Sequence, residues 1–138
     1  MNISVLGCGR WGSFHAWYAH RVGHVVTLWG RAGSVHLNEL RETRTNEFLM
    51  LPEDIRLTED LAEAIHSAEI IIISIHAQAL RSFLHDLCAC RLGDVLVKKR
   101  IILCMKGLEI GTGKRLSTVV HEALGDAVQP VVWVGPGH

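Results

Sequence analysis

The chain has 138 residues, the length of one domain, and hydrophobic residues make up 49% of it, an ordinary share for a globular protein. Basic and acidic residues number 14 each, so no overall charge attracts nucleic acid or an anionic membrane. No apolar run approaches the length needed to span a bilayer, and the first residues lack the basic segment of a signal peptide. The composition therefore argues against nucleic-acid binding and against a membrane span, and it predicts a cytoplasmic protein.

Strand-like and helix-like segments alternate along the whole chain. Strands are predicted at residues 2–6, 25–29, 55–57, 70–75, 100–105 and 131–134, and helices at 11–22, 34–43, 59–67, 78–90 and 114–124. Several strands are continuous β-branched runs, as in strands buried on both faces of a parallel sheet. Gly23 and Gly125 stand where glycines end helices, and Thr58 is a candidate N-cap. The alternation predicts one α/β domain over residues 1–138, a Rossmann-like, doubly wound, mostly parallel sheet with helices on both faces.

The four cysteines have neither the spacing of a disulfide framework nor that of a zinc site. Cys8, Cys88, Cys90 and Cys104 are interpreted as buried free thiols. Cys8 stands close to a predicted helix N-terminus, where a thiol pKa can be lowered; the alternative is that the position only requires a small side chain. The histidines form no group with metal-ligand spacing either, so no metal site is predicted.

The most informative motif is Gly7-Cys8-Gly9-Arg10-Trp11-Gly12, between the first predicted strand and the first predicted helix. In this context G-x-G-x-x-G indicates a dinucleotide site. Gly7 allows the tight turn, Gly9 lets a pyrophosphate approach the backbone, and Gly12 lets the helix pack against the strand. The amides at the helix N-terminus then point at the phosphates. Arg10 either assists the pyrophosphate or extends into solvent, and Trp11 either covers the cofactor or packs in the core.

Ligands of an open α/β sheet bind beyond the carboxyl ends of its strands, and this rule selects further residues. Arg31 stands near the position, about twenty residues after the glycine turn, where an acidic residue would bind the ribose 2′-hydroxyl of NAD. A guanidinium can instead bind a 2′-phosphate, which favours NADP; the alternative is a solvated arginine. Lys106 follows the fifth strand, where an ammonium either attracts a phosphate or polarises an oxygen in the crevice, or else only caps the strand. His76 also ends a strand, a place where a structural role is the commoner one.

With these residues placed, the chain resembles the N-terminal domain of NAD(P)-dependent glycerol-3-phosphate dehydrogenase over almost all of its length. The glycine turn is similar to the family's G-x-G-S-W-G, and Lys106-Gly107-Leu108-Glu109 matches its K-G-L-E. Further matches are Asn46, Phe48-Leu49, Leu51-Pro52, Thr58-Glu59-Asp60-Leu61 and Gly135-Pro136. The chain departs from the family at Arg10, in place of a serine, at His76-Ala77, in place of Pro-Ser, and in a shorter segment over residues 46–52.

The resemblance implies an oxidoreductase of glycerophospholipid metabolism that interconverts sn-glycerol 3-phosphate and dihydroxyacetone phosphate with NAD or NADP. This chain would supply the cofactor-binding half, and a homodimer is one expectation for the full-length form. The resemblance assigns cofactor contacts to Gly7, Gly9, Arg10, Trp11, Gly12, Arg31 and Lys106, and substrate contacts to Lys106, Gly135 and Gly137. It places the catalytic lysine in a helical C-terminal domain outside this chain, so the 138 residues alone are expected to be inactive.

Two other functions remain open at this point. One is a non-catalytic NAD(P)-binding module, which the substitutions at Arg10 and His76 leave open. The other is a related Rossmann reductase of a hydroxy or keto acid, against which the K-G-L-E segment followed by Gly135-Pro136 argues.

Overall fold

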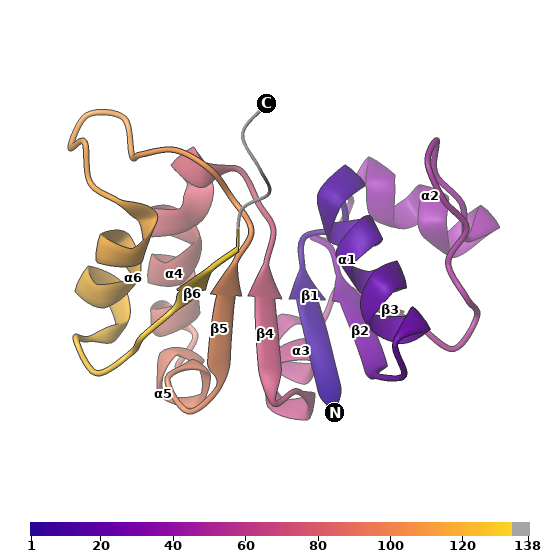
Figure 1. The fold of residues 1–138 in the computed structure, drawn as a ribbon, viewed down its shortest axis with the longest axis horizontal. Coiled ribbons are helices and arrows are strands. Elements are labelled where there is room, and N and C mark those ends of the chain that lie inside the picture. Colours follow the sequence, from indigo (N-terminus) through magenta and orange to yellow (C-terminus); the bar gives the residue numbers. More distant parts are fainter. Residues whose placement is uncertain (134–138) are drawn as a thin grey trace.

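The computed structural model describes residues 1–133, which form a six-stranded, all-parallel sheet with helices on both faces (Figure 1). The strand order is β3-β2-β1-β4-β5-β6, so the direction of winding reverses at β1. This arrangement confirms the predicted Rossmann-like fold. In chain order the elements are β1 (Asn2–Leu6), α1 (Arg10–Arg21), β2 (Val25–Trp29), α2 (Val35–Thr43), β3 (Arg56–Thr58), α3 (Leu61–Ser67), β4 (Ile70–Ile73), the 3₁₀ helix η1 (Ala77–Ala79), α4 (Leu80–Ala89), α5 (Gly93–Leu96), β5 (Arg100–Leu103), α6 (Leu116–Leu124) and β6 (Val131–Val132).

Two apolar cores lie on the two faces of the sheet, because the strands are apolar on both sides. Val5 and Leu28 belong to the core that α1 and α2 cover, together with the segment that leads into β3. Leu6 and Ile73 belong to the other core, which α3, α4, α5 and α6 cover. Ser4 is fully buried within β1, and its hydroxyl donates to the Ala64 carbonyl oxygen of α3 at 2.5 Å, which offsets the loss of water around that group.

The carboxyl ends of the strands lie level with one another at one edge of the sheet. Leu6 is paired with both Trp29 and Ile73, and Ile73 is paired in turn with Leu103. The segments that follow β1, β2, β4 and β5 therefore leave the sheet side by side, and this is the edge at which an open parallel sheet binds ligands.

Several predicted boundaries were wrong, mostly at this edge. The strands predicted at 70–75 and 100–105 end at Ile73 and Leu103, and β3 covers Arg56–Thr58 instead of 55–57. β4 stops there because its partner β1 turns away after Leu6, and β5 stops level with β4, its own partner. Of the strand predicted at 131–134, only Val131–Val132 is observed, and residue 134 lies outside the described part.

The helices also differ in detail from the sequence-based expectation. The helix predicted at 78–90 begins as η1 and continues as α4, the short α5 was not predicted, and the helix predicted at 114–124 begins at Leu116. The N-cap of α3 is Asp60, whose carboxylate accepts from the Glu63 amide at 3.1 Å, so the assignment of that cap to Thr58 was wrong. Gly23 and Gly125 follow α1 and α6 with φ of 103° and 104°, as glycines at helix ends commonly do.

The cysteines are free, but they are not all buried as predicted. Cys8 is buried and Cys104 is half-buried, whereas Cys88 and Cys90 are exposed. Burial raises the pKa of the Cys104 thiol to about 11. Within residues 1–133, no helix combines the length and the apolar content needed to cross a membrane.

Candidate functional site

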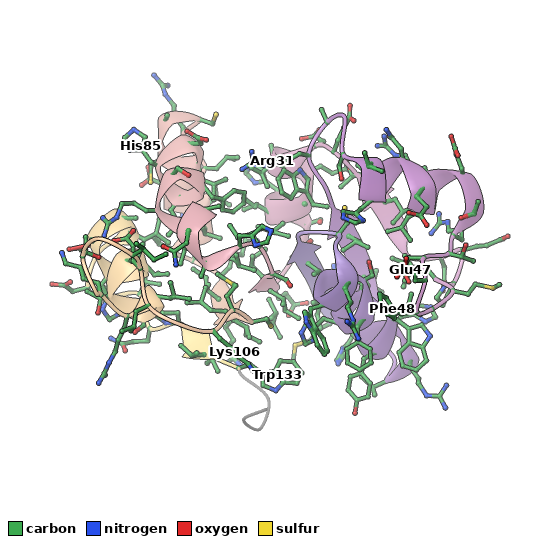
Figure 2. The ribbon with its side chains drawn as sticks, turned by 90° about the horizontal axis from the view of Figure 1, so that it is seen from above. Arg31, Glu47, Phe48, His85, Lys106 and Trp133 are labelled. Atoms are coloured by element: carbon green, nitrogen blue, oxygen red, sulfur yellow. The ribbon has the colours of Figure 1, made fainter. Side chains whose placement is uncertain are left out.

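A cleft of about 1570 Å³ opens at the carboxyl edge of the sheet, bounded by the segments after β1, β2, β4 and β5. Figure 2 looks down on this edge and shows Arg31 on one side of the sheet and Lys106 on the other, with Trp133 beside Lys106. The predicted cofactor and substrate residues within residues 1–133 all line this one cleft: Gly7, Gly9, Arg10, Trp11, Gly12, Arg31 and Lys106. The predicted substrate residues Gly135 and Gly137 lie outside the described part.

The glycine turn is a close approach of three backbone segments. Gly7 has φ of 118°, a conformation that side chains disfavour, and a Cβ built on it would overlap the carbonyl oxygen of Ser74 after β4. A Cβ on Gly12 would overlap the carbonyl oxygen of Gly7, so α1 packs directly on the turn. Gly9 differs from both, because a Cβ there would meet only open space. Two of the glycines are therefore required by packing within the protein, and the third faces the cleft.

The N-terminus of α1 is open to an anion. Its N-cap is Gly9, which has no side chain to accept from the first amides, and the first turn carries no acidic residue. By contrast, the side chains of Ser34 and Asp60 cap α2 and α3. The hydroxyl of Ser13 donates to the carbonyl oxygens of Cys8 and Gly9, at 3.0 and 2.7 Å, which fixes the turn and leaves its amides free. The positive end of the helix dipole thus meets the cleft.

The charged side chains that line the cleft are all of one sign. Arg10, Arg31 and Lys106 contribute basic groups, and within residues 1–133 no aspartate or glutamate lines the cleft. Together with the N-terminus of α1, these three cations make a site that favours a ligand with several negative charges.

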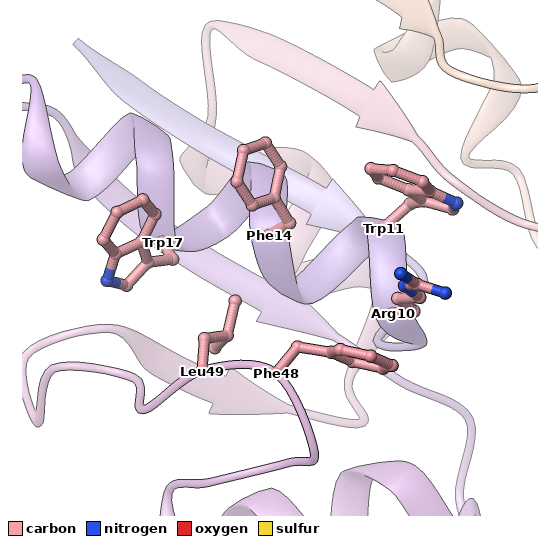
Figure 3. Close-up of a pocket in the computed structure, with 6 residues that line it drawn as sticks. All are labelled: Arg10, Trp11, Phe14, Trp17, Phe48 and Leu49. Carbon is pink, nitrogen blue, oxygen red and sulfur yellow. The ribbon is translucent and has the colours of Figure 1, made fainter. Parts of the chain in front are cut away.

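A smaller pocket of about 290 Å³ adjoins the cleft on the outer side of α1, and Figure 3 shows its lining. The guanidinium of Arg10 lies 4.1 Å from the ring centroid of Phe48 and 5.4 Å from that of Trp11. Trp11 is 56% exposed, so of the two alternatives that the sequence left open for it, packing in the core was wrong. Phe48 comes from the segment between α2 and β3, which sequence reasoning matched to a family motif without assigning it to the site. Its stacking on Arg10 brings that segment to the edge of the cleft.

Cys8 has a packing role in this turn. Burial raises the pKa of its thiol, so the lowered pKa considered for a residue beside a helix N-terminus is not found. A Cβ on Gly30 would lie only 2.5 Å from the sulfur of Cys8, and the sulfur is 3.7 Å from the hydroxyl of Ser34. The position holds a small side chain between the ends of β1 and β2, which is the alternative that the sequence left open.

Several cleft residues were not predicted from sequence. His15 and Trp133 line it with ring centroids 5.1 Å apart, and burial lowers the pKa of His15. His36, from the first turn of α2, and Gln78, from η1, also line it. Each of these residues stands just after a strand or in the first turns of the helix that follows, so the strand-end rule contained the signal that would have found them. His76, for which the sequence favoured a structural role, lines the cleft as well.

An all-parallel sheet with its winding reversed at β1, a glycine turn and an anion-attracting cleft together define a Rossmann-like dinucleotide-binding domain. The family model of the NAD-dependent glycerol-3-phosphate dehydrogenase N-terminus matches residues 2–138. The chain therefore belongs to the NAD-dependent glycerol-3-phosphate dehydrogenase family and corresponds to its N-terminal domain, as the motifs predicted. Family membership implies that it binds NAD or NADP.

Individual relatives agree with this assignment. Proteins named glycerol-3-phosphate dehydrogenase [NAD(P)+] from Thermoanaerobacter sp. (strain X514) and Geobacillus kaustophilus are each 37% identical over 142 residues, covering 100% and 99% of this chain. The crystal structure of glycerol-3-phosphate dehydrogenase from Coxiella burnetii superposes with a TM-score of 0.76 and 27% identity, over 96% of this chain and 39% of that one. The chain spans about 40% of the length of the relatives that it matches.

Proposed function

We propose that this chain is the cofactor-binding half of an enzyme that interconverts sn-glycerol 3-phosphate and dihydroxyacetone phosphate with NAD(P). The observation that carries the proposal is that one cleft, with no carboxylate among its linings in residues 1–133, joins the glycine turn to Lys106 of the K-G-L-E segment. Relatives that carry the name glycerol-3-phosphate dehydrogenase, at 37% identity across the whole chain, support the choice of substrate.

The residues of the glycine turn fit a dinucleotide. The open space at Gly9 and the uncapped amides of α1 suit a pyrophosphate, and no acidic residue of the first turn opposes it. Gly7, Gly9 and Gly12 would receive the pyrophosphate, Arg10 would add a positive charge beside it, and Trp11 would cover its exposed side. When bound, the nicotinamide supplies the chemistry of hydride transfer, and the protein holds it in place.

Arg31 follows β2 at the edge of the cleft, and we propose that it binds the 2′-phosphate of NADP. A hydrogen bond from a guanidinium to such a charged group contributes about 1.5–3 kcal/mol, so NADP should bind more tightly than NAD. Titration of the protein with NADPH and NADH is expected to show this preference. Arg31→Gln should weaken NADPH binding roughly tenfold or more and leave NADH binding unchanged. Equal affinity of the native protein for the two cofactors would contradict the proposal.

Lys106 is the proposed contact with the substrate. Its ammonium stands at the end of β5, on the side of the cleft away from Arg31, where it can attract the phosphate and hold the substrate toward the cofactor (Figure 2). We further propose that Gly135 and Gly137 contact the substrate through their backbone. No proton donor for the hydroxyl is assigned to this chain, because the resemblance places the catalytic lysine in another domain.

The decisive test is Lys106→Ala in the full-length enzyme. Loss of this charged contact with the substrate should lower kcat/KM for dihydroxyacetone phosphate roughly 100-fold, or about 2.7 kcal/mol of transition-state stabilisation. Arg56→Gln is a suitable control, because it removes a basic group from an exposed ion pair with Glu63 outside the cleft. Native kinetics in Lys106→Ala would remove this residue from the site. A protein that binds NADPH but does not turn over the substrate at all would favour the non-catalytic alternative.

A further inference from the structure

Lys106 lies near the start of the long connection between β5 and α6. After Lys106, the connection's own backbone bonds, from the Glu109 amide to the Lys114 carbonyl oxygen and from the Gly113 amide to the Glu109 carbonyl oxygen, both at 2.9 Å, close it on itself and do not tie it to the sheet. Gly107 has φ of 96°, Ile110 is 81% exposed, and a single bridge between Leu108 and Arg115 is the connection's only sheet-like pairing within the described residues. Met105, just before Lys106, is buried in the core, but the residues after Lys106 bury little apolar surface, so other contacts must fix the backbone that follows it.

Gln78 of η1 supplies one such contact by using both ends of its amide. Its Nε2 donates to the Leu108 carbonyl oxygen at 2.9 Å, and its Oε1 accepts from the Ile110 amide at 2.8 Å. The side chain thereby pairs with the connection much as a neighbouring strand would. Because η1 begins only four residues after the last residue of β4, this pair of bonds ties the connection to the neighbouring strand end of the sheet.

Arg81, one turn further along in α4, supplies the second contact. Its Nε and Nη2 donate to the two carboxylate oxygens of Glu109 at 2.8 and 3.0 Å, a bidentate pair of high directional specificity. The Glu109 side chain is 12% exposed, and it also accepts from the Thr112 hydroxyl at 2.6 Å. Nη2 of Arg81 also donates to Glu122 of α6 at 2.7 Å, which joins α6 as well as the connection to α4.

We propose that Gln78 and Arg81 are positioning residues that hold the backbone after Lys106 so that its ammonium is fixed in the cleft. Only Gly107 and Leu108 separate Lys106 from Glu109, which Arg81 holds in place, so displacement of Glu109 moves the lysine backbone with it. A lysine side chain is flexible, and fixing its base reduces the freedom lost when the substrate binds. This inference rests on the proposed contact of Lys106 with the substrate.

Arg81 and Glu109 give the clearest test, because neither lines the cleft and any effect on substrate binding must pass through the connection. The experiment measures the Kd for glycerol 3-phosphate in the presence of NADPH, a pair that does not react, by calorimetry on the full-length enzyme. Arg81→Gln and Glu109→Gln are each expected to raise this Kd about tenfold, and the double variant no more than either one. Arg56→Gln, the matched loss of a guanidinium from another ion pair, is expected to leave it unchanged.

The same measurement in a Lys106→Ala background separates positioning from general destabilisation. Arg81→Gln should add no further loss there, because the group that it positions is gone; an additional loss would overturn the inference. Native affinity in both Arg81→Gln and Glu109→Gln, with Lys106→Ala impaired, would overturn it and leave the proposed function standing. Native affinity in Lys106→Ala would overturn both this inference and the proposed contact of Lys106 with the substrate.

Hydrogen exchange supplies a reading that depends on no ligand. The Ile110 amide is bonded to Gln78, so Gln78→Ala and Arg81→Gln should speed its exchange in the free enzyme, while Arg56→Gln should not. Unchanged exchange of the Ile110 amide in both Gln78→Ala and Arg81→Gln would show that these side chains do not fix the connection, and would overturn the inference.

Discussion

At the scale of single residues, the glycine turn separates what folding requires from what ligand binding requires. A Cβ on Gly12 would overlap the backbone of Gly7, whereas a Cβ on Gly9 would meet open space. The backbone of Gly9, with φ of −72° and ψ of −163°, is extended and has the negative φ that alanine also adopts. The two positions stand in the same motif, yet their substitution by alanine should have opposite consequences.

Gly12→Ala is expected to destabilise the protein by about 3 kcal/mol and to lower Tm by roughly 10 °C, because α1 cannot move away from the turn without losing its packing. Gly9→Ala should lower stability by no more than about 1 kcal/mol, the amount by which alanine is a poorer N-cap than glycine. It should nevertheless weaken NADPH binding at least tenfold, because the methyl group takes the space of the pyrophosphate. Thermal unfolding and a cofactor titration check both. A stable Gly12→Ala, or a Gly9→Ala with native NADPH affinity, would contradict this account.

At the scale of elements, local sequence patterns predict the strands and helices of this fold well and their ends poorly. The apolar runs at β1, β2 and β4 and the glycines after α1 and α6 are local signals, and the observed elements follow them. Where β4 and β5 stop depends instead on where β1 turns away, which is a relation between distant segments. The sequence of an isolated strand does not contain that relation.

The residues of the site likewise fall into those that local sequence predicts and those that depend on contacts between distant segments. Arg31 and Lys106 could be predicted because each lies within three residues of the end of a strand, and the sheet brings strand ends together. The stacking of Phe48 on Arg10 and the bonds of Gln78 and Arg81 to the β5–α6 connection could not, since they join residues about 30 or more apart in the chain. The predicted parts of the site are those that the fold class fixes, and the unpredicted parts are those that side-chain contacts add.

At the scale of the whole molecule, the ion pairs of Arg81 with Glu109 and Glu122 also make the stability of the fold depend on pH. Arg81 and then Thr112, through hydrogen bonds, hold the pKa of Glu109 at about 2, below its ordinary 4.5. Hydrogen bonds from Lys114 and Arg81 also lower the pKa of Glu122. Both carboxylates therefore join α4, α6 and the connection in their charged forms.

A group whose pKa is depressed by folding stabilises the native state above its ordinary pKa, and this contribution is lost as the pH falls toward the folded value. For Glu109 that window runs from about pH 4.5 down to about 2, where the unfolded chain binds a proton that the native protein does not.

Arg81→Gln brings the pKa of Glu109 back toward its ordinary value, so the free energy of unfolding should fall less steeply with acid than in the native protein. Urea unfolding at a series of pH values between 6 and about 3 measures the two slopes. Arg41→Gln, which breaks the exposed pair with Glu59 and leaves Glu109 untouched, should keep the native slope. If Arg81→Gln also keeps the native slope, Arg81 does not depress the pKa of Glu109, and the ion pair between them does not account for the loss of stability in acid.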